Sequence, residues 1–339
     1  MSETKVKKTY TKQDFTSDQA VRWCPGCGDY AILSQAQKVF PELGIPRENF
    51  LIVSGIGCSS RFPYYMNTYG FHSIHGRAPA LASGAKLANP DLSVWVVTGD
   101  GDAMSIGGNH LIHVLRRNVD MNILMFNNRI YGLTKGQYSP TSELGKVTKS
   151  TPMGSLDYPF NPPQLALGAS GTFIARTIDR ELKHMSTILQ AANNHCGTSF
   201  VEIYQNCNIF NDGAFADISD KKTKAENQLV LEHGKPMIFG ADNDKGLILD
   251  GSNFKVVKLG KNYSPNDILI HNMENKNLAM MLSEITYIPE LPVPIGILYQ
   301  ENKPTYENMM AEQIREAVKT KGNGDLEQII LGNNSWDVE

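Results

Sequence analysis

The sequence has no hydrophobic segment long enough to cross a membrane. No apolar run in its 339 residues approaches the roughly 18 residues that a spanning helix requires. Residues 1–15 are polar and lack the apolar core of a secretory signal peptide. The net charge of −3 gives no basic footprint for nucleic acid or for an acidic membrane surface. These absences predict a cytoplasmic protein that binds neither nucleic acid nor membrane.

Cysteine is also scarce, with five in the chain. In a reducing compartment, clustered thiols bind metal more often than they form disulfides. Cys24 and Cys27 lie in the stretch WCPGCGDY, whose CxxC pattern is typical of zinc ribbons and rubredoxins. A zinc ribbon requires a second CxxC pair, and the sequence contains none. The other ligands of a four-thiolate site must therefore come from Cys58, Cys196 and Cys207.

Short β-rich runs alternate with helical stretches between about residues 28 and 206. The runs are continuously apolar and rich in Val, Ile and Phe, as in parallel strands that are covered on both faces. This alternation predicts an α/β fold with a doubly wound, mainly parallel sheet. The expected strands are residues 49–55, 92–100, 121–128, 171–176 and 199–204, and the expected helices are residues 30–40, 77–90, 105–118 and 179–194.

The composition suggests three parts. Residues 1–22 form an N-terminal arm, residues 23–208 form the α/β domain, and residues 209–339 form a C-terminal extension. Within the extension, residues 236–260 predict a β-hairpin with an Asp/Asn/Gly turn. The helix expected at residues 306–321 has too little apolar core to stand alone. We expect it to pack on a partner subunit or back on the sheet.

Polar residues follow three of the expected strands. Gly57-Cys58-Ser59 follows the first, Gly99-Asp100-Gly101 the second and Asn127-Asn128 the third. In open α/β sheets, ligands bind beyond the carboxyl ends of the strands. Asp100 and Asn128 offer the hard oxygen ligands that suit Mg²⁺, and the glycines allow close approach of backbone to phosphate. The helix expected from Ser105 would add N–H groups, and Asp102 would orient amides of the turns. The pattern predicts a diphosphate–Mg²⁺ site.

Twenty-five residues separate the Gly-Asp-Gly from the Asn-Asn, an interval that fits one strand–helix–strand crossover. This arrangement resembles the thiamine diphosphate motif of the thiamine enzymes. The resemblance implies that Mg²⁺ is held by Asp100, Asn128 and the backbone carbonyl of Ile130.

Four longer segments narrow the resemblance. They are similar to segments of the β-subunit of the 2-oxoacid:ferredoxin oxidoreductases, and their sequences are CPGCGDY, SGIGCSSRFPYY, FHSIHGRAPALASGAKLANP and NNRIYGLTKGQYSPTS. The form KGQYSPTS favours the 2-oxoglutarate type. The resemblance covers residues 23–207 and implies coenzyme A-dependent oxidative decarboxylation of 2-oxoglutarate to succinyl-CoA and CO₂. Electrons would pass through a [4Fe–4S] cluster to ferredoxin, and the reaction would be reversible. Pyruvate, or a broad range of 2-oxoacids, is the alternative substrate.

Topology selects the cluster ligands. Cys58 and Cys207 each follow an expected strand and so lie at the edge that carries Asp100, whereas Cys196 precedes a strand and lies at the opposite edge. The predicted set is therefore Cys24, Cys27, Cys58 and Cys207. Spacing does not separate zinc from iron–sulfur, so a zinc-stabilised, non-redox nucleotide-binding subunit is the alternative of another class. Oxidation of a decarboxylated 2-oxoacid needs an electron acceptor, and no lipoyl or flavin motif is apparent, which favours the cluster.

Further residues are expected around the cofactor. Ile56, Gly57 and Ser59 share the turn of Cys58, and Gly132 and Leu133 follow Ile130 closely. His75 occupies the place where the family contacts thiamine diphosphate. Lys135 is a candidate catalytic residue, as a cation for the substrate carboxylate or for coenzyme A phosphates.

The chain contains a single unit of this kind, so the glutamate that activates the cofactor's aminopyrimidine should come from an α-subunit. We expect an αβ or α2β2 assembly that is inactive without this partner.

Overall fold

The computed structural model describes residues 9–336 and 338. Residues 1–8 of the expected N-terminal arm, and residues 337 and 339 of the expected extension, lie outside this description. Among the described residues, no helix combines the length and the apolar character needed to cross a bilayer.

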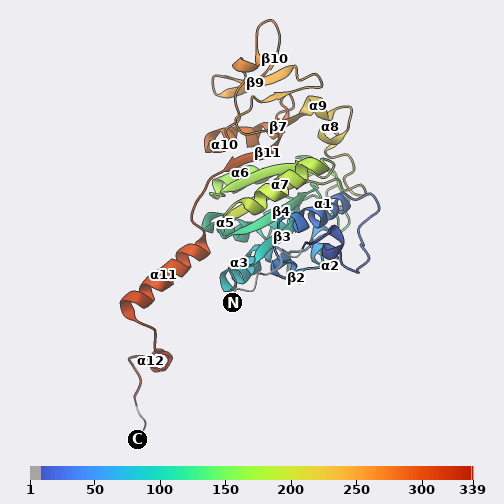
Figure 1. Ribbon diagram of the computed structural model, residues 1–339. Coiled ribbons are helices and arrows are strands. Elements are labelled where there is room, and N and C mark those ends of the chain that lie inside the picture. The colour runs from blue at the N-terminus through green and yellow to red at the C-terminus, as the bar shows by residue number, and fades with distance from the viewer. Residues whose placement is uncertain (1–8, 337, 339) are drawn as a thin grey trace.

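An eight-stranded sheet forms the centre of the molecule (Figure 1), with the order β2-β1-β3-β4-β6-β5-β11-β7. Every neighbouring pair is parallel except β11 with β5. The five expected strands correspond to β1, β3, β4, β5 and β6, which confirms the mainly parallel α/β fold. The strands are β1 Phe50–Ser54, β2 Tyr69–His72, β3 Ser93–Gly99, β4 Met121–Asn127, β5 Phe173–Ile178, β6 Thr198–Tyr204, β7 Gln228–Leu231 and β11 Val293–Gln300.

Helices cover both faces of this sheet. On one face α1 (Asp29–Glu42) packs beside α7 (Leu182–Asn194). On the other face lie α3 (Ala78–Ala88), α5 (Gly108–Arg117), α6 (Pro162–Gly168) and α10 (Lys276–Glu284). The remaining helices are short, apart from α11: α2 Phe62–Tyr65, α4 Asp100–Met104, α8 Ala216–Ser219, α9 Lys224–Asn227, α11 Tyr306–Lys321 and α12 Leu326–Leu331, with 3-10 turns at Lys12–Phe15, Arg47–Asn49, Ser59–Arg61, Pro265–Asp267 and Ile285–Tyr287.

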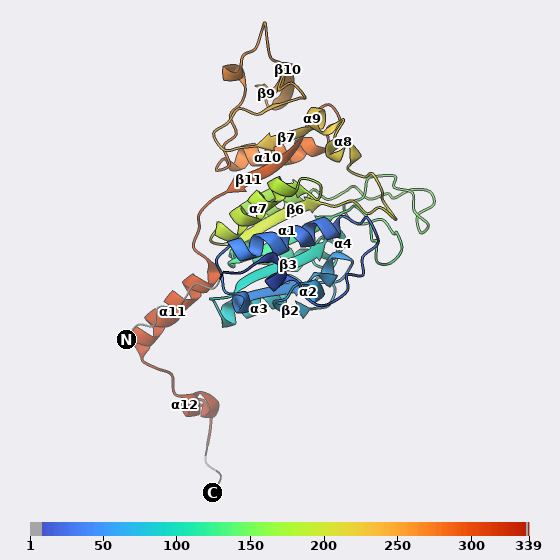
Figure 2. The ribbon, with the colours of Figure 1, turned by 45° about the vertical axis from the view of Figure 1, so that its right-hand side comes forward.

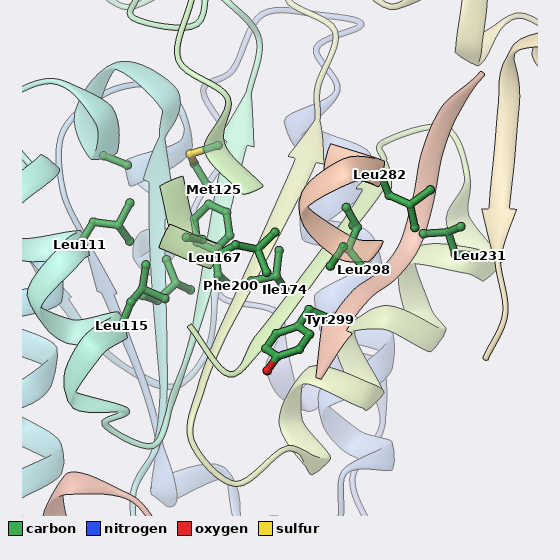
Figure 3. Close-up of a cluster of buried hydrophobic side chains, with 14 of the residues drawn as sticks. Leu111, Leu115, Met125, Leu167, Ile174, Phe200, Leu231, Leu282, Leu298 and Tyr299 are labelled. Carbon is green, nitrogen blue, oxygen red and sulfur yellow. The ribbon is translucent and has the colours of Figure 1, made fainter. Parts of the chain in front are cut away.

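Alternation along the strands builds two cores. In β3, Val94 and Val96 face the core under α3 and α5, whereas Trp95 and Val97 face the core under α1 and α7. This is the two-residue period of a strand that is buried on both sides. Figure 3 shows that the first core continues from α5 and the middle of the sheet to β11, where Leu298 lies near Leu282 of α10.

The C-terminal part extends the central sheet and adds a second one. β7 and β11 join the central sheet, and β8 (Ile238–Phe239), β9 (Lys245–Asp250) and β10 (Asn253–Lys258) form a separate antiparallel sheet. The pairing of β9 with β10 confirms the expected hairpin. The division of the chain at residue 208 stays a prediction.

The chain then leaves the body at the amino-terminal edge of the strands. Figures 1 and 2 both show α11 and α12 extending away from the sheet. The start of α11 is fixed, because Asn118 Nδ2 donates to the carbonyls of Lys303 and Pro304 and the amide of Asp120 donates to Glu307. Beyond Ala311 every residue of α11 is exposed.

One expected element begins elsewhere. The prediction that a helix starts at Ser105 is wrong. The helix α4 already begins at Asp100, and a turn at residues 105–107 separates α4 from α5. This turn packs against Gly76, where an added Cβ would lie 2.5 Å from the amide nitrogen of Gly107. Asp100 and Asp102 therefore stand in the first turn of a short helix and not in a loop before a long one.

Candidate functional site

Loops from four strands meet at the carboxyl edge of the sheet and enclose a cavity. All residues expected to bind the cofactor line it. Phe126, Tyr131 and Thr134, which were not predicted, line it as well. A larger cavity of about 860 Å³ shares His75, Tyr131 and Thr134 with it, so the two adjoin. The expected residues that come together are Ile56, Gly57, Cys58, Ser59, His75, Gly99, Asp100, Gly101, Asp102, Asn128, Ile130, Gly132 and Leu133.

Asp100 is buried beneath this cavity, with 2% of its surface exposed. Its Oδ2 accepts hydrogen bonds from the hydroxyls of Ser139 at 2.5 Å and Thr141 at 2.7 Å. Burial raises the pKa of Asp100, and the two hydroxyls oppose that shift. Since the hydroxyls occupy one carboxylate oxygen, Oδ1 is the candidate ligand atom for a cation.

The side-chain amide of Asn128 is oriented by its neighbours. Its Nδ2 donates to Gln205 Oε1 at 2.8 Å, and its Oδ1 accepts from the amide of Ile130 at 3.1 Å. An amide oxygen has two lone pairs, so Oδ1 retains one for a cation. A carboxylate, an amide oxygen and the Ile130 carbonyl are a donor set that fits Mg²⁺.

Asp102 holds three turns together. Its Oδ1 lies 2.6 Å from His75 Nδ1 and accepts from the amides of Gly76 at 2.7 Å and Ile56 at 3.1 Å. Its Oδ2 accepts from the Thr98 hydroxyl at 2.6 Å. The carboxylate passes so close to Gly55 that a Cβ there would lie 1.8 Å from Oδ2. Asp102 thus fixes the lining of the cavity.

The four predicted cysteine ligands line a second cavity of about 170 Å³, beside the first. Gly132 lies between the two, since a Cβ at this glycine would be 3.6 Å from Cys207 Sγ and 3.7 Å from Cys58 Sγ. Cys196 does not line this cavity; it is exposed and precedes β6. The structure therefore brings together Cys24, Cys27, Cys58 and Cys207.

The four cysteines line one cavity. Among the residues that the structure describes, no three His, Cys, Asp or Glu side chains are placed to hold a single metal ion. Four thiolates around one cavity are a donor set that fits a [4Fe–4S] cluster. Burial, together with the charge of Asp29, raises the pKa of Cys58 to about 11, so metal binding must displace its proton.

Two buried carboxylates, Asp29 and Asp179, lie beside the cysteine loops, and sequence reasoning missed both. Burial raises the pKa of Asp29, which is 1% exposed, to about 7, and the Asp179 charge adds to the shift. Asp179 Oδ2 accepts from the amide of Asn206 at 2.8 Å, and a Cβ on Gly28 would lie 1.9 Å from the same oxygen. The amide of Gly28 donates to the Asn206 carbonyl. Asp179 thereby joins the loop of Cys27 to the loop of Cys207.

Lys135 lies on the rim of the cysteine cavity and does not line the cavity of Asp100. It is exposed, and its φ of 81° lies in the left-handed region that non-glycine residues rarely adopt. Backbone in such a region is retained where the surroundings impose it, often at functional positions.

The parallel sheet and the cavity at its carboxyl edge define a thiamine diphosphate-binding domain. The family model for "Thiamine pyrophosphate enzyme, C-terminal TPP binding domain" matches residues 55–203, from the end of β1 to β6.

Individual relatives extend the match. The chain is 52% identical over 331 residues to 2-oxoglutarate oxidoreductase subunit KorB of Mycobacterium tuberculosis, covering 96% of this chain and 88% of the relative. It is 47% identical over 190 residues to subunit beta of 2-oxoacid:ferredoxin oxidoreductase 1 of Aeropyrum pernix, covering 56% and 60% of the two chains.

A solved structure of 2-oxoglutarate:ferredoxin oxidoreductase from Magnetococcus marinus, with 2-oxoglutarate, coenzyme A and succinyl-CoA bound, has a TM-score of 0.75 at 32% identity. The match covers 95% of this chain and 96% of that chain. The chain belongs to the β-subunits of the 2-oxoacid:ferredoxin oxidoreductases, which confirms the predicted family of oxidoreductases. Its β-subunit character implies an α-subunit partner.

Proposed function

We propose that this chain is the β-subunit of a 2-oxoglutarate:ferredoxin oxidoreductase. The reaction converts 2-oxoglutarate and coenzyme A to succinyl-CoA and CO₂ and transfers two electrons to ferredoxin, and it is reversible. The observation that carries the proposal is the contact between the two cavities, because Cys58 and Gly132 line both. A redox centre held by the four cysteines would lie directly beside the cofactor of the carbon chemistry.

The chain's own residues hold the two centres. Asp100 Oδ1, Asn128 Oδ1 and the Ile130 carbonyl would bind Mg²⁺, and His75, Gly132 and Leu133 would contact the diphosphate. Cys24, Cys27, Cys58 and Cys207 hold the [4Fe–4S] cluster. When bound, thiamine diphosphate stabilises the charge left as CO₂ departs, and the cluster accepts electrons singly. Asp102 holds His75 and the turns at Gly76 and Ile56 in place around the cofactor site.

The activating carboxylate comes from the α-subunit in this proposal. Among the described residues that line the two adjoining cavities, the carboxylates are Asp100, Asp102 and Asp157, and none is a glutamate. Asp100 and Asp102 are already engaged by hydroxyls and amides. The isolated chain should therefore be inactive, and the assembled αβ or α2β2 enzyme active.

Saturation kinetics of the assembled enzyme test the substrate. We expect the specificity constant for 2-oxoglutarate to exceed that for pyruvate; equal constants would overturn the choice of substrate.

The iron and sulfide content of an anaerobic preparation tests the redox role. A colourless protein with one zinc per chain would instead support a non-redox subunit.

Lys135 is proposed to bind an anionic group of 2-oxoglutarate or coenzyme A. A charge-assisted hydrogen bond contributes about 1.5–3 kcal/mol. Lys135→Ala should therefore raise the KM of one of these ligands about tenfold or more with little change in kcat. The ligand whose KM rises identifies the bound anion.

Lys149→Ala is the matched control for Lys135→Ala, since Lys149 is exposed in the same long loop. Unchanged KM values for both ligands in Lys135→Ala would contradict the role of Lys135.

The C-terminal extension is proposed to contact the α-subunit through its arm, residues 306–336. Ile314, Val318, Leu326, Ile329 and Trp336 are all exposed there, and an isolated 16-residue helix is only marginally stable in water. A chain that ends after Ala311 keeps the anchored start of α11. It should retain its thermal midpoint as an isolated subunit but bind the α-subunit more weakly. Light scattering of the mixture across concentrations measures this, and unchanged assembly would refute the contact.

A further inference from the structure

The first asparagine of the Asn127-Asn128 pair does not line the cofactor cavity. Asn127 is 1% exposed, and its Nδ2 donates to Glu202 Oε1 at 2.8 Å. Its Oδ1 accepts from the amide of Arg129 at 3.2 Å and lies 3.0 Å from the Thr141 hydroxyl. A carboxylate can only accept, so Glu202 decides which end of the Asn127 amide faces the turn.

Glu202 is in turn held by Arg176. Both side chains are fully buried, and Arg176 Nε donates to Glu202 Oε2 at 2.6 Å. Arg176 Nη1 donates to the hydroxyl of Thr286 at 2.7 Å and to the carbonyl of Pro294. A buried carboxylate needs such a paired and hydrogen-bonded cation to stay charged. The pair thus links the C-terminal segment to the loop after β4.

The oxygen of Asn127 stabilises an unfavourable backbone conformation. Arg129 has a φ of 55°, in the left-handed region that is unfavourable for a non-glycine residue. The Asn127 oxygen binds its amide, and the Ser142 hydroxyl donates to its carbonyl at 2.6 Å. This turn sets the positions of Asn128 Oδ1 and of the Ile130 carbonyl.

The same network reaches the third magnesium ligand. The Thr141 hydroxyl lies 2.7 Å from Asp100 Oδ2 as well as 3.0 Å from Asn127 Oδ1. One chain of contacts therefore runs from Arg176 through Glu202, Asn127 and Thr141 to Asp100, and a branch runs through Arg129 to the other two ligands.

We propose that Glu202, paired with Arg176, is a positioning residue for the magnesium site. It fixes the Asn127 amide, and that amide sets the turn that presents Asn128 and Ile130 and orients Thr141 on Asp100. The inference rests on the proposed Mg²⁺–thiamine diphosphate site. The affinity of that site for Mg²⁺ then depends on the buried Arg176–Glu202 ion pair, which does not line the cavity.

Double variants separate this role from simple packing. Arg176→Met/Glu202→Leu removes the acceptor, and apolar replacement of a buried pair is often neutral for stability. Arg176→Met/Glu202→Gln keeps an oxygen that can accept from Asn127 Nδ2. The readout is a Mg²⁺ titration of thiamine diphosphate binding to the αβ complex by calorimetry, with the thermal midpoint of the cofactor-free complex as the check on folding.

We expect the leucine variant to need about 10–100-fold more Mg²⁺, as for other partners that orient metal ligands, and the glutamine variant to recover most of the affinity. Wild-type Mg²⁺ dependence in the leucine variant would overturn the inference, as would equal losses in both variants. Asn127→Ala leaves the Arg176–Glu202 ion pair intact and replaces the leucine variant in this test if that variant does not fold. Wild-type Mg²⁺ affinity in Asn127→Ala would also overturn the inference. Failure of the wild-type complex to bind thiamine diphosphate would refute the proposed function instead.

Discussion

Cys58→Ser is expected to reduce the iron content of the anaerobically purified complex from about four atoms per chain to nearly none. Serine presents an alkoxide ligand that is rarely available near neutral pH, and Cys58 is the thiol whose loop lines both cavities. Loss of the cluster removes the electron acceptor beside the cofactor, so ferredoxin reduction should fall below detection. Iron and sulfide analysis, visible absorbance and ferredoxin reduction measure these effects.

Cys196→Ser is the matched control for Cys58→Ser. Cys196 is the one cysteine that does not line the cysteine cavity, and it lies before β6, at the opposite edge of the sheet. Its replacement should leave iron content and activity unchanged. Full iron content in Cys58→Ser, or loss of iron in Cys196→Ser, would show that the ligand assignment is wrong.

The assignment of Cys58 and Cys207 could be made from sequence because strand direction is encoded locally. Continuous apolar runs identify buried parallel strands, and the carboxyl ends of such strands meet at one edge. Residues that follow β1, β3, β4 and β6 are therefore close in space although they are far apart in the chain. The same reasoning brought Asp100 and Asn128 to one cavity.

Other features of the fold depend on contacts that no local pattern records. β11 lies between β5 and β7 and is antiparallel to one and parallel to the other, although it begins in a proline-rich segment. β2 is an edge strand with all four residues exposed, so it lacks the apolar run that marks the other strands. α4 starts at Asp100 after Gly99, with no side-chain hydrogen bond at its cap, so no capping signal marks this start in the sequence.

The partners of the site residues were harder to predict than the residues themselves. Ser139 and Thr141 belong to the KGQYSPTS segment, which indicated a family but not their hydrogen bonds to Asp100. Arg176 and Glu202 lie inside strands and look like ordinary charged residues until β5 and β6 pair. Their role follows from burial and register, which are properties of the assembled sheet.

Asp100→Asn is expected to weaken Mg²⁺-dependent binding of thiamine diphosphate by more than about 100-fold and to abolish turnover. Residues that only orient metal ligands already contribute about 10–100-fold, and Asp100 supplies the one negative charge among the three proposed ligands. The new side chain can still accept from Ser139 and Thr141 through its oxygen. Its NH₂ group then faces the cation position, where it cannot coordinate. Calorimetric titration of the αβ complex with Mg²⁺ and cofactor measures the loss.

Stability should respond to Asp100→Asn in the opposite direction. Burial raises the pKa of Asp100, so the ionised carboxylate destabilises the cofactor-free fold once the pH exceeds the ordinary carboxyl range. The variant should therefore have an equal or higher thermal midpoint at neutral pH, and the difference should vanish in acid, where the unfolded chain and the native state both carry the proton.

Asp91→Asn, an exposed change just before β3, should alter neither binding nor turnover. Undiminished binding in Asp100→Asn would contradict the magnesium assignment, whereas lost binding with a lowered midpoint would point to damaged folding. If the Asp100 charge is buried in order to bind a cation, Asp100→Asn must lower the affinity for Mg²⁺ and cofactor while the stability of the fold is retained.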